Sequence, residues 1–257
     1  YTLQDVDVYG IKLEKMVLRD NSAVYGGALY NGRNILSNCK MYGNSAQYGG
    51  AIALGRNTIR QSSIWNNKAS ANGGGIYCTQ GSSFPKDTFI VLGSTISSNS
   101  AQNGGGIYWT APIEMRNTVI DSNIASSQGG GLYSTGNYKA VIAGCIFSRN
   151  KSGAIYGGFP TVSSCVFNNN AAGSSNSAVM NVSGFTAVNS IISDPVKTSG
   201  AIQISYSIID TITNATLGSG STGNIMFADP KFVNVSKGDY HLLPNSPAID
   251  FFKKAEF

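Results

Sequence analysis

Charge is scarce in this sequence of 257 residues: only 12% are Asp, Glu, Lys or Arg, and a single residue is His. The net charge of +5 is spread thinly, and no run of Lys or Arg forms the basic stripe typical of nucleic-acid-binding proteins. No apolar stretch approaches the length that spans a membrane, and no signal peptide is visible. Apolar residues with helical spacing are also missing, because Gly and Ser interrupt every run. We therefore expect no nucleic-acid partner, no membrane-spanning segment and no helical fold.

Glycine, in contrast, is abundant (31 residues) and recurs in a repeated five-residue segment. Gly-Gly-Gly-Ile-Tyr occurs twice, at 73–77 and 104–108. Close variants of it begin at residues 26, 49, 129, 152, 176 and 199. Most successive segments start 23 to 25 residues apart, and one pair starts 31 apart. A period in the twenties is the signature of a solenoid, in which each supersecondary unit stacks on the next.

A second motif runs in step with the first and ends in asparagine. Each asparagine follows a large apolar residue by three positions, and most of them follow a small residue by five. Small-x-large has a period of two, so both side chains point to one face of a short strand. At a turn, the asparagines would form an amide ladder in which each side chain bonds its copies above and below. The predicted ladder contains Asn21, Asn44, Asn67, Asn99, Asn123, Asn150 and Asn170.

Three short strands in each coil, separated by turns, predict an all-β fold: a right-handed parallel β-helix of about nine to ten coils. One strand would carry the Gly-Gly-Ala-Ile-Tyr segments, one would carry segments such as 58–60, and one would carry segments such as 39–41. Equivalent strands pair from coil to coil, so their apolar residues align. The predicted inward column contains Ile52, Ile76, Ile107 and Leu132.

The whole chain, 1–257, is expected to be a single β-helix domain, because a solenoid has no separate cores that would divide it. Residues 1–15 would form an incomplete N-terminal coil, and 16–210 would form the regular coils. Residues 211–257 would form irregular C-terminal coils and a closure.

Three of the four cysteines occupy the small inward position of the second motif. Cys145 and Cys165 should lie on neighbouring coils with their Cα atoms about 4.8 Å apart, which is inside the range for a disulfide. In-register stacking keeps the Cβ atoms farther apart than a relaxed disulfide requires. Stacked buried thiols are therefore favoured, and a disulfide stays open as the alternative.

Together the two motifs resemble the short-repeat signature of the polymorphic outer-membrane protein family, F-x-x-N with G-G-A-[ILV]. The first element stands at 147–150 (Phe-Ser-Arg-Asn) and 167–170 (Phe-Asn-Asn-Asn), and the second at 26–29 (Gly-Gly-Ala-Leu) and 49–52 (Gly-Gly-Ala-Ile). The stretch 227–250 resembles the D-P-x-F-V…G-D-Y-x-L-x-P-x-S-P-A-I-D ending of extracellular β-helix proteins that often carry a surface anchor. The resemblance implies an exported bacterial protein at the cell surface or outside the cell, and it specifies no activity.

The acidic residues do not favour catalysis, although parallel β-helices often cleave polysaccharides. A glycosidase needs two carboxylates about 5–10 Å apart, and the nearest approach to such a pair is Asp87 with Glu114. Asp194, Asp210 and Asp229 are expected to be solvated turn residues rather than calcium ligands. We therefore predict no catalytic residues, no metal site and no cofactor.

An outward aromatic stripe is the first candidate binding site. Tyrosines that follow the inward Ile or Leu should point outward, and Trp109 and Trp65 would extend this aromatic surface. Such a stripe would stack on sugar rings, and the alternative is that these tyrosines only cover the Gly-rich turns. The predicted stripe contains Tyr30, Tyr77, Tyr108, Tyr133 and Tyr156.

An insertion at 78–93, which carries Phe84 and Lys86, is the second candidate binding site. Solenoids place function on such loops, although a passive bulge is an equal alternative.

The expected function is that of a non-catalytic extracellular or cell-surface β-helix module. It would be adhesin-like, and would bind glycans or proteins or act as a display stalk. A polysaccharide lyase or glycoside hydrolase of the pectate-lyase-like β-helix class is the alternative. A further alternative is self-association through uncapped coil ends into a filament or a surface-layer component.

Overall fold

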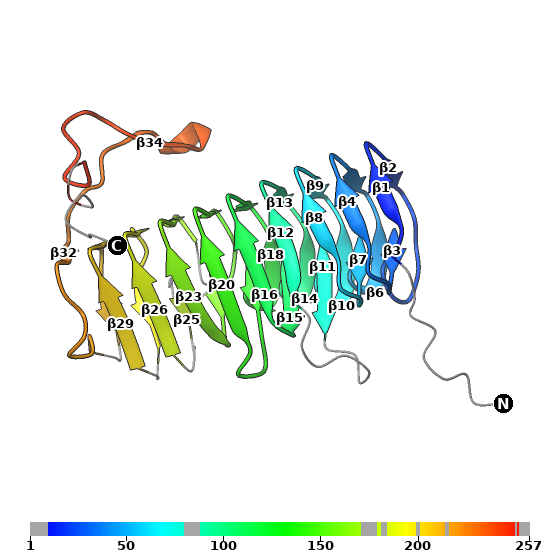
Figure 1. Ribbon diagram of the computed structural model, residues 1–257, viewed down its shortest axis with the longest axis horizontal. Coiled ribbons are helices and arrows are strands. Elements are labelled where there is room, and N and C mark those ends of the chain that lie inside the picture. The colour runs from blue at the N-terminus through cyan, green and yellow to red at the C-terminus, as the bar shows by residue number, and fades with distance from the viewer. Residues whose placement is uncertain are drawn as a thin grey trace.

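The computed structural model describes residues 10–79, 88–170, 179–180, 184–198, 201–213, 216–249 and 251. They form a parallel β-solenoid in which the chain passes from one long sheet to the next in every turn (Figure 1). We call the three long sheets 1, 2 and 3, in their order along a turn, and a shorter corner sheet lies between sheets 2 and 3. The all-β parallel solenoid expected from the repeats is confirmed, with three long parallel sheets.

The strands are two to five residues long. Sheet 1 contains β1 (Lys12–Glu14), β4 (Ile35–Ser37), β8 (Thr58–Arg60), β12 (Phe89–Leu92), β16 (Ile113–Arg116), β20 (Lys139–Ala143), β23 (Phe159–Ser163), β26 (Gly184–Val188) and β29 (Ala201–Ser205). Sheet 2 contains β2 (Val17–Arg19), β5 (Lys40–Tyr42), β9 (Ser63–Trp65), β13 (Thr95–Ser97), β17 (Val119–Asp121), β21 (Ile146–Ser148), β24 (Val166–Asn168), β27 (Ile191–Ile192), β30 (Ile208–Ile209) and β32 (Ile225–Met226). Sheet 3 contains β3 (Leu29–Tyr30), β7 (Ile52–Ala53), β11 (Ile76–Thr79), β15 (Ile107–Thr110), β19 (Leu132–Tyr133), β22 (Ile155–Tyr156), β25 (Val179–Met180), β28 (Val196–Lys197) and β31 (Ile212–Thr213).

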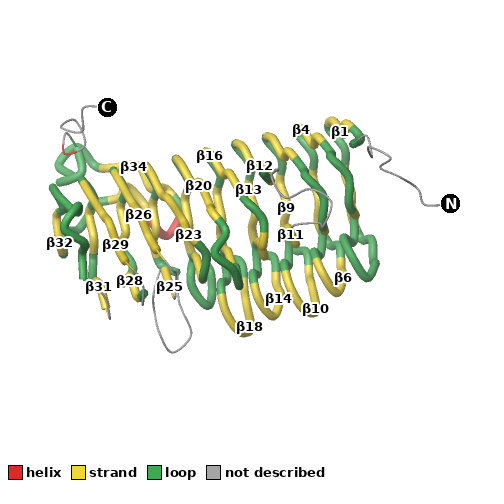
Figure 2. The backbone as a smooth tube through the Cα atoms, turned by 60° about the horizontal axis from the view of Figure 1, so that its bottom comes forward, coloured by secondary structure: helices red, strands yellow, loops and turns green. Residues whose placement is uncertain are grey.

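The corner sheet contains β6 (Ser45–Tyr48), β10 (Lys68–Asn72), β14 (Ser100–Asn103) and β18 (Ile124–Gln128). Figure 2 shows these four strands along one edge of the solenoid. Their register shifts in each pair, and this fourth strand of the middle turns was not predicted. Among the residues that the structure describes, no helix is long and apolar enough to cross a membrane.

Register from turn to turn builds the core. Strand β8 pairs in parallel with β4 on one side and with β12 on the other, and sheet 3 repeats the arrangement. The apolar side chains of equivalent strands therefore stack inside the solenoid, and these columns exclude water. The predicted inward column is confirmed, because Ile52, Ile76, Ile107 and Leu132 are in register and fully buried.

Residues with a left-handed backbone conformation form the bends between the strands. Asn38 (φ 56°) and Asn117 (φ 49°) lie between sheets 1 and 2, and asparagine tolerates this conformation better than most residues. Gly49 (φ 66°) and Gly73 (φ 68°) open the five-residue repeat. A Cβ atom at either glycine would collide with the carbonyl oxygen three residues farther on. The bend therefore favours glycine as the first residue of the repeat, although Ser152 adopts the same left-handed conformation (φ 76°).

The last part of the described chain turns back onto the outer face of sheet 2. Strands β33 (Phe232–Asn234) and β34 (Asp239–Leu242) form an antiparallel hairpin, connected by the 3-10 helix η1 (Val235–Lys237). Figure 1 shows the hairpin above the solenoid, at the end farthest from β1. Phe232, Leu242 and Ala248 pack there with Ile191 and Ile208. They form a second, smaller apolar cluster outside the solenoid core.

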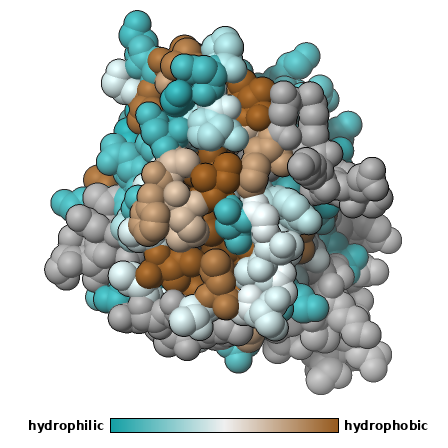
Figure 3. All heavy atoms as spheres, turned by 90° about the vertical axis from the view of Figure 1, so that its left-hand side faces the viewer, coloured by the Kyte–Doolittle hydropathy of each residue, from teal (hydrophilic) through white to brown (hydrophobic). Residues whose placement is uncertain are grey.

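The end of the solenoid below this hairpin is partly apolar. In the view from that end, hydrophobic residues lie beside hydrophilic ones across the described surface (Figure 3). Met226 and Phe227, in and directly after β32, are among the exposed large hydrophobic residues.

Candidate functional site

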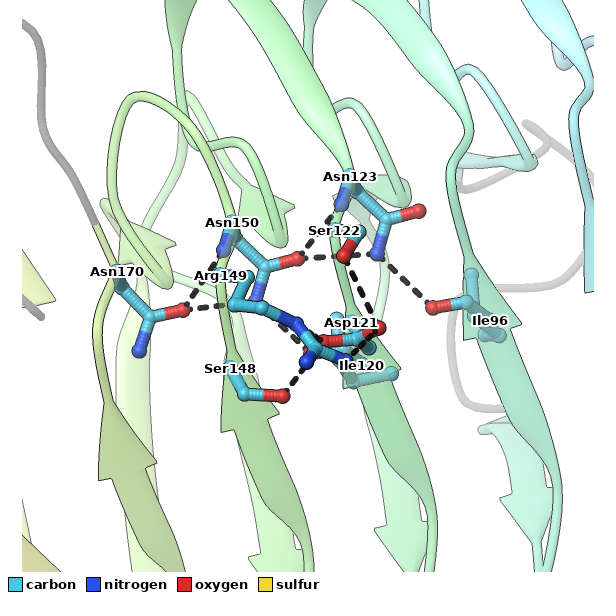
Figure 4. Close-up of polar contacts among 9 residues, drawn as sticks. All are labelled: Ile96, Ile120, Asp121, Ser122, Asn123, Ser148, Arg149, Asn150 and Asn170. Atoms are coloured by element: carbon cyan, nitrogen blue, oxygen red, sulfur yellow. Dashed lines mark hydrogen bonds and ion pairs between the residues drawn. The ribbon is translucent and has the colours of Figure 1, made fainter. Parts of the chain in front are cut away.

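The predicted asparagine ladder is present at all seven positions. Asn99 shows the pattern: its Nδ2 donates to Asn123 Oδ1 (3.0 Å) and to the Ile64 carbonyl oxygen (3.0 Å). Its Oδ1 accepts from the Nδ2 (2.9 Å) and the backbone N (3.0 Å) of Asn67. Figure 4 shows the rungs that follow. The other Nδ2–Oδ1 distances are 2.9 Å (Asn21–Asn44), 2.9 Å (Asn44–Asn67), 3.0 Å (Asn123–Asn150) and 2.8 Å (Asn150–Asn170).

A carboxylate ends this ladder. Asn170 donates through its backbone N (3.1 Å) and its Nδ2 (2.8 Å) to Asp194 Oδ2. Asp194 is only 8% exposed, so the expectation that it is a solvated turn residue is wrong. Burial raises the pKa of its carboxyl group, the hydrogen bonds from Asn170 oppose this, and the charge of Asp210 adds to it. The sequence could have revealed Asp194 as the next ladder position, because it lies 24 residues after Asn170.

Two further ladders were not predicted. Asn34 Nδ2 donates to Asn57 Oδ1 (2.8 Å), and both side chains are buried at another corner of the turn. Their separation of 23 residues, which equals the repeat, was the signal for this pair. Small inward residues form the other ladder, in which a backbone N–H donates to the side chain one turn on, as from Ser62 N to Ser94 Oγ (3.1 Å).

The cysteines are free thiols in the core. All four are buried, and Cys145 N donates to Cys165 Sγ (3.3 Å), so these two stack on adjacent turns as the sequence favoured. The hydrogen bond with Cys145 and burial both raise the pKa of the Cys165 thiol. Burial raises the pKa of the Cys78 thiol to about 12. A protonated, covered thiol is a poor nucleophile, so Cys78 and Cys165 contribute packing rather than chemistry.

Tyrosines form a column on the outside of the solenoid. Tyr77, Tyr108, Tyr133 and Tyr156 are in register on sheet 3. Their ring centroids are 5.1, 5.4 and 5.2 Å apart, in that order. Four of the five tyrosines predicted for the stripe therefore stack continuously.

The first turns continue this column with other residues. Ala53 occupies the register position beside Tyr77, and Tyr48 from the corner sheet fills the space, with its ring centroid 5.1 Å from that of Tyr77. Tyr25 stacks on Tyr48 at 5.0 Å, whereas the predicted Tyr30 is tilted against Tyr25 at 5.8 Å. The tyrosine column is thus Tyr25, Tyr48, Tyr77, Tyr108, Tyr133 and Tyr156.

Stacking covers the ring faces of the inner members of the column. Tyr77, Tyr108 and Tyr133 each have a neighbouring ring on both sides. Tyr108 is 9% exposed, and its hydroxyl lies 3.4 Å from Thr135 Oγ1. Burial, and then the neighbouring tyrosines, raise the pKa of the Tyr77 and Tyr133 hydroxyls. The inner rings therefore offer edges and hydroxyls to a ligand, and a sugar has no room to stack on their faces.

Neither tryptophan extends the column. Trp109 is fully buried in the core, so its prediction as a surface aromatic residue is wrong. The reason is the strand period of two: Ile107 points inward, Tyr108 points outward, and the longer strand β15 returns Trp109 to the inside. Trp65 lies on sheet 2, where it stacks on Tyr42 with ring centroids 4.5 Å apart.

The structure leaves the candidate site at 78–93 untested and shows Glu114 in an ion pair. Phe84, Lys86 and Asp87 lie outside the residues that the structure describes. Glu114 Oε1 forms an ion pair with Arg116 Nε at 2.6 Å. Within the described ranges, no three His, Cys, Asp or Glu residues lie close enough together to hold a metal ion.

The hairpin creates a cleft that the sequence did not indicate. A cavity of about 510 Å³ lies between strand β34 and the bends at Gly144 and Ser164. Lys237 lines it, as do Asp239 and His241, whose Oδ1 and Nδ1 atoms are 2.6 Å apart. The two sides of the cleft come from distant parts of the chain and follow no repeat, which is why periodicity did not reveal it.

Figure 4 shows a charged cluster formed by Asp121, Ser148 and Arg149. Arg149 donates to both oxygens of Asp121 (Nε–Oδ1 2.9 Å, NH2–Oδ2 2.8 Å), and Ser148 Oγ donates to Asp121 Oδ1 (2.7 Å). Burial alone would raise the pKa of the Asp121 carboxyl group, but these hydrogen bonds and one from Ser122 lower it. The Arg149 guanidinium also lies next to Gly238 of the hairpin. The cluster therefore adjoins the place where the hairpin meets the solenoid.

No family model, no curated protein and no solved structure matches this chain. The parallel β-solenoid and its asparagine ladder are therefore established by the structure, and the comparisons assign no family.

Proposed function

We propose that this chain is a non-catalytic, adhesin-like module that works at the cell surface or outside the cell and binds a glycan chain along the tyrosine column. Its solenoid would be a right-handed parallel β-helix of nine to ten coils. The strand counts of nine, ten and nine in sheets 1, 2 and 3 support that size. The right hand follows from the general rule for crossover connections between parallel strands.

The exported setting rests on the resemblance to polymorphic outer-membrane protein repeats and to the ending of surface-anchored β-helix proteins. The structure gives the repeat elements a physical role. The asparagine of F-x-x-N is a rung of the ladder, as at Asn150, and the first glycine of G-G-A-[ILV] makes a left-handed bend, as at Gly49. Such a repeat suits a rigid module that presents one side to its surroundings.

The tyrosine column is the observation that carries the proposal. Its rings follow one another at 5.0 to 5.4 Å along the solenoid and form a line rather than a patch. A line of equally spaced groups suits a linear polymer better than a compact ligand. Because the inner ring faces are covered, the contacts would be hydrogen bonds to phenol hydroxyls and apolar contacts with ring edges.

A glycan array with the full chain tests this proposal, followed by the triple variant Tyr77→Phe, Tyr133→Phe and Tyr156→Phe. Phenylalanine keeps the stacked rings and removes only the hydroxyls, so we expect an unchanged fold and at least tenfold weaker binding of the glycan that the array identifies. Tyr42→Phe, in the separate Tyr42–Trp65 stack, is the matched control and should bind as the wild type does. An array with no hits, or a hit that the triple variant binds unchanged, would overturn the proposal.

A further inference from the structure

The cleft under the hairpin has an apolar floor. Ile146 and Val166 line it, and they are in register on the adjacent strands β21 and β24, with side chains on the outer face of sheet 2. Gly144 (φ 62°) and Gly238 (φ 73°) line it as well, so no side chain blocks the approach to the backbone at these two points. The cleft therefore accommodates a flat molecule with one apolar face.

Among the described residues that line the cleft, Lys237 is the cation without a carboxylate partner. Asp239 Oδ1 lies 2.6 Å from His241 Nδ1, a contact that is an ion pair only when the histidine is protonated, and Arg149 pairs with Asp121. Lys237 also lines the cleft, and in the described part of the chain no carboxylate lies within ion-pair distance of its side chain. An anionic group on the ligand would supply the missing partner, and such a charge-assisted hydrogen bond is stronger than a neutral one.

These features together select a class of ligand. An inorganic anion would leave the apolar floor at Ile146 and Val166 uncovered, and an uncharged apolar molecule would make no contact with the charge of the exposed Lys237. A sugar with a carboxylate satisfies both, because its C–H face packs on the floor while its charge meets the lysine. Asp239 and His241, at the exposed rim, offer hydrogen-bonding atoms for ring hydroxyls. The volume of about 510 Å³ is within the range of small-molecule sites.

We propose that this cleft binds a single carboxylated sugar unit, with the carboxylate at Lys237 and the C–H face of the ring over Ile146 and Val166. The site is separate from the tyrosine column and does not depend on the function proposed for it.

Titration of the full chain with D-glucuronate, its methyl ester and D-glucose tests this proposal by calorimetry or NMR. The ester and glucose keep the sugar ring and lack the charge. We expect saturable binding of D-glucuronate, and at least tenfold weaker binding of the other two. Lys237→Met should weaken D-glucuronate binding at least tenfold. The matched control Lys68→Met, at an exposed lysine on the corner sheet, should bind as the wild type does.

The role of the apolar floor of the cleft is tested by Val166→Ser. This variant keeps every charge and should weaken D-glucuronate binding several-fold. Circular dichroism of each variant confirms that the solenoid is folded. The triple tyrosine variant should bind D-glucuronate unchanged, which separates this site from the column. The proposal is overturned by the absence of saturable D-glucuronate binding, by equal binding of all three compounds, or by unchanged binding in Lys237→Met.

Discussion

The outer face of sheet 2 differs between the first turns and the last. One outward position, followed in register along the sheet, is exposed or half-buried at the start and buried toward the end. In the last turns, Phe232, Leu242 and Ala248 of the C-terminal segment cover it. The same strand position therefore faces solvent in one region and a second apolar cluster in the other. This position is occupied by Val17, Lys40, Ser63, Thr95, Val119, Ile146, Val166, Ile191, Ile208 and Ile225.

The two regions also differ in how they close the corner after sheet 2. From Asn44 to Asn170, a buried amide bonds the turns on both sides, and at Asp194 a carboxylate accepts the last two hydrogen bonds. The C-terminal segment covers the sheet from Ile146 and Val166, whose turns still contain ladder asparagines, to Ile191 and Ile208, where the amide ladder has ended. We infer that the first and middle turns draw their stability from contacts inside the repeat, whereas the last turns draw part of theirs from a cover that the repeat does not encode.

The largest effect is expected from Asn99→Leu in the middle of the ladder. Leucine removes the acceptor of Asn67 N and one acceptor of Asn67 Nδ2. It also removes the Nδ2 group that donates to the Ile64 carbonyl oxygen and to Asn123 Oδ1. Each buried polar group left without a partner costs about 1–3 kcal/mol. The free energy of unfolding, measured by urea denaturation, should therefore fall by at least ~3 kcal/mol.

The control for this prediction is Asn21→Leu, at the exposed first rung. It removes only the Nδ2 donor to Asn44 Oδ1, which keeps its hydrogen bond from the backbone N–H of residue 21, and we expect a loss below about 1 kcal/mol. Equal losses in the two variants would show that the ladder is no stronger in its buried middle than at its exposed end.

The second effect concerns the covered outer face. Ile208 is buried between sheet 2 and the C-terminal segment, so Ile208→Ala should lower the free energy of unfolding by about 2 kcal/mol through lost apolar contacts and a cavity. Thr95→Ala, at the equivalent uncovered position, should change it by less than about 0.5 kcal/mol. Equal small effects in urea denaturation would mean that the hairpin rests on the sheet without stabilising it.

The sequence predicted the strongest repeats, and it missed the weaker repeats and the contacts that follow no repeat. The inward column and the seven-residue ladder follow from a fixed spacing, because stacking turns superimposes equivalent residues. Asp194 broke the pattern by replacing an amide with an acid, although its spacing was preserved. Tyr48 was missed because a side chain from one strand fills a gap left by Ala53 on another, which the register alone does not reveal.

The hairpin and its cleft depend on contacts between segments with no common period. A signal was nevertheless present, since the outward position of sheet 2 changes from Lys40, Ser63 and Thr95 to Ile191 and Ile208. Consecutive apolar residues on both faces of a strand indicate that both faces are covered. The sequence thus showed where a cover was needed, and it did not show which segment would supply it.

A smaller effect is expected from Asp194→Asn, which should change how the melting temperature depends on pH. Burial raises the pKa of Asp194 in the folded state above its unfolded value. Its contribution to stability is therefore complete below the unfolded pKa and is lost as the pH rises through the folded pKa. Asparagine does not titrate, so the melting temperature of the variant should fall less than that of the wild type over this interval. Identical pH profiles would show that Asp194 is not the titrating group.

The smallest effect is expected at the boundary between the two regions, from Arg149→Met. The Arg149 side chain is 38% exposed, so solvent screens its bidentate pair with Asp121, and the free energy of unfolding should fall by less than about 1 kcal/mol. The contribution of this ion pair to stability changes with pH in the opposite direction to that of Asp194. The pKa of Asp121 is lowered in the folded state, so its contribution is present above the unfolded pKa and is lost as the pH falls through the folded pKa. The variant should lose less stability than the wild type in that acid range.

Hydrogen exchange distinguishes a local ion pair from a link between the regions. Because the Arg149 guanidinium lies next to Gly238, a link predicts faster amide exchange in β34 of Arg149→Met and unchanged exchange in β9 and β13. Arg19→Met, at an ion pair whose two side chains are both largely exposed, is the control and should change neither. Unchanged exchange in β34 would mean that the hairpin is held by its apolar cluster alone. The charged cluster would then contribute nothing to the stability of the covered face.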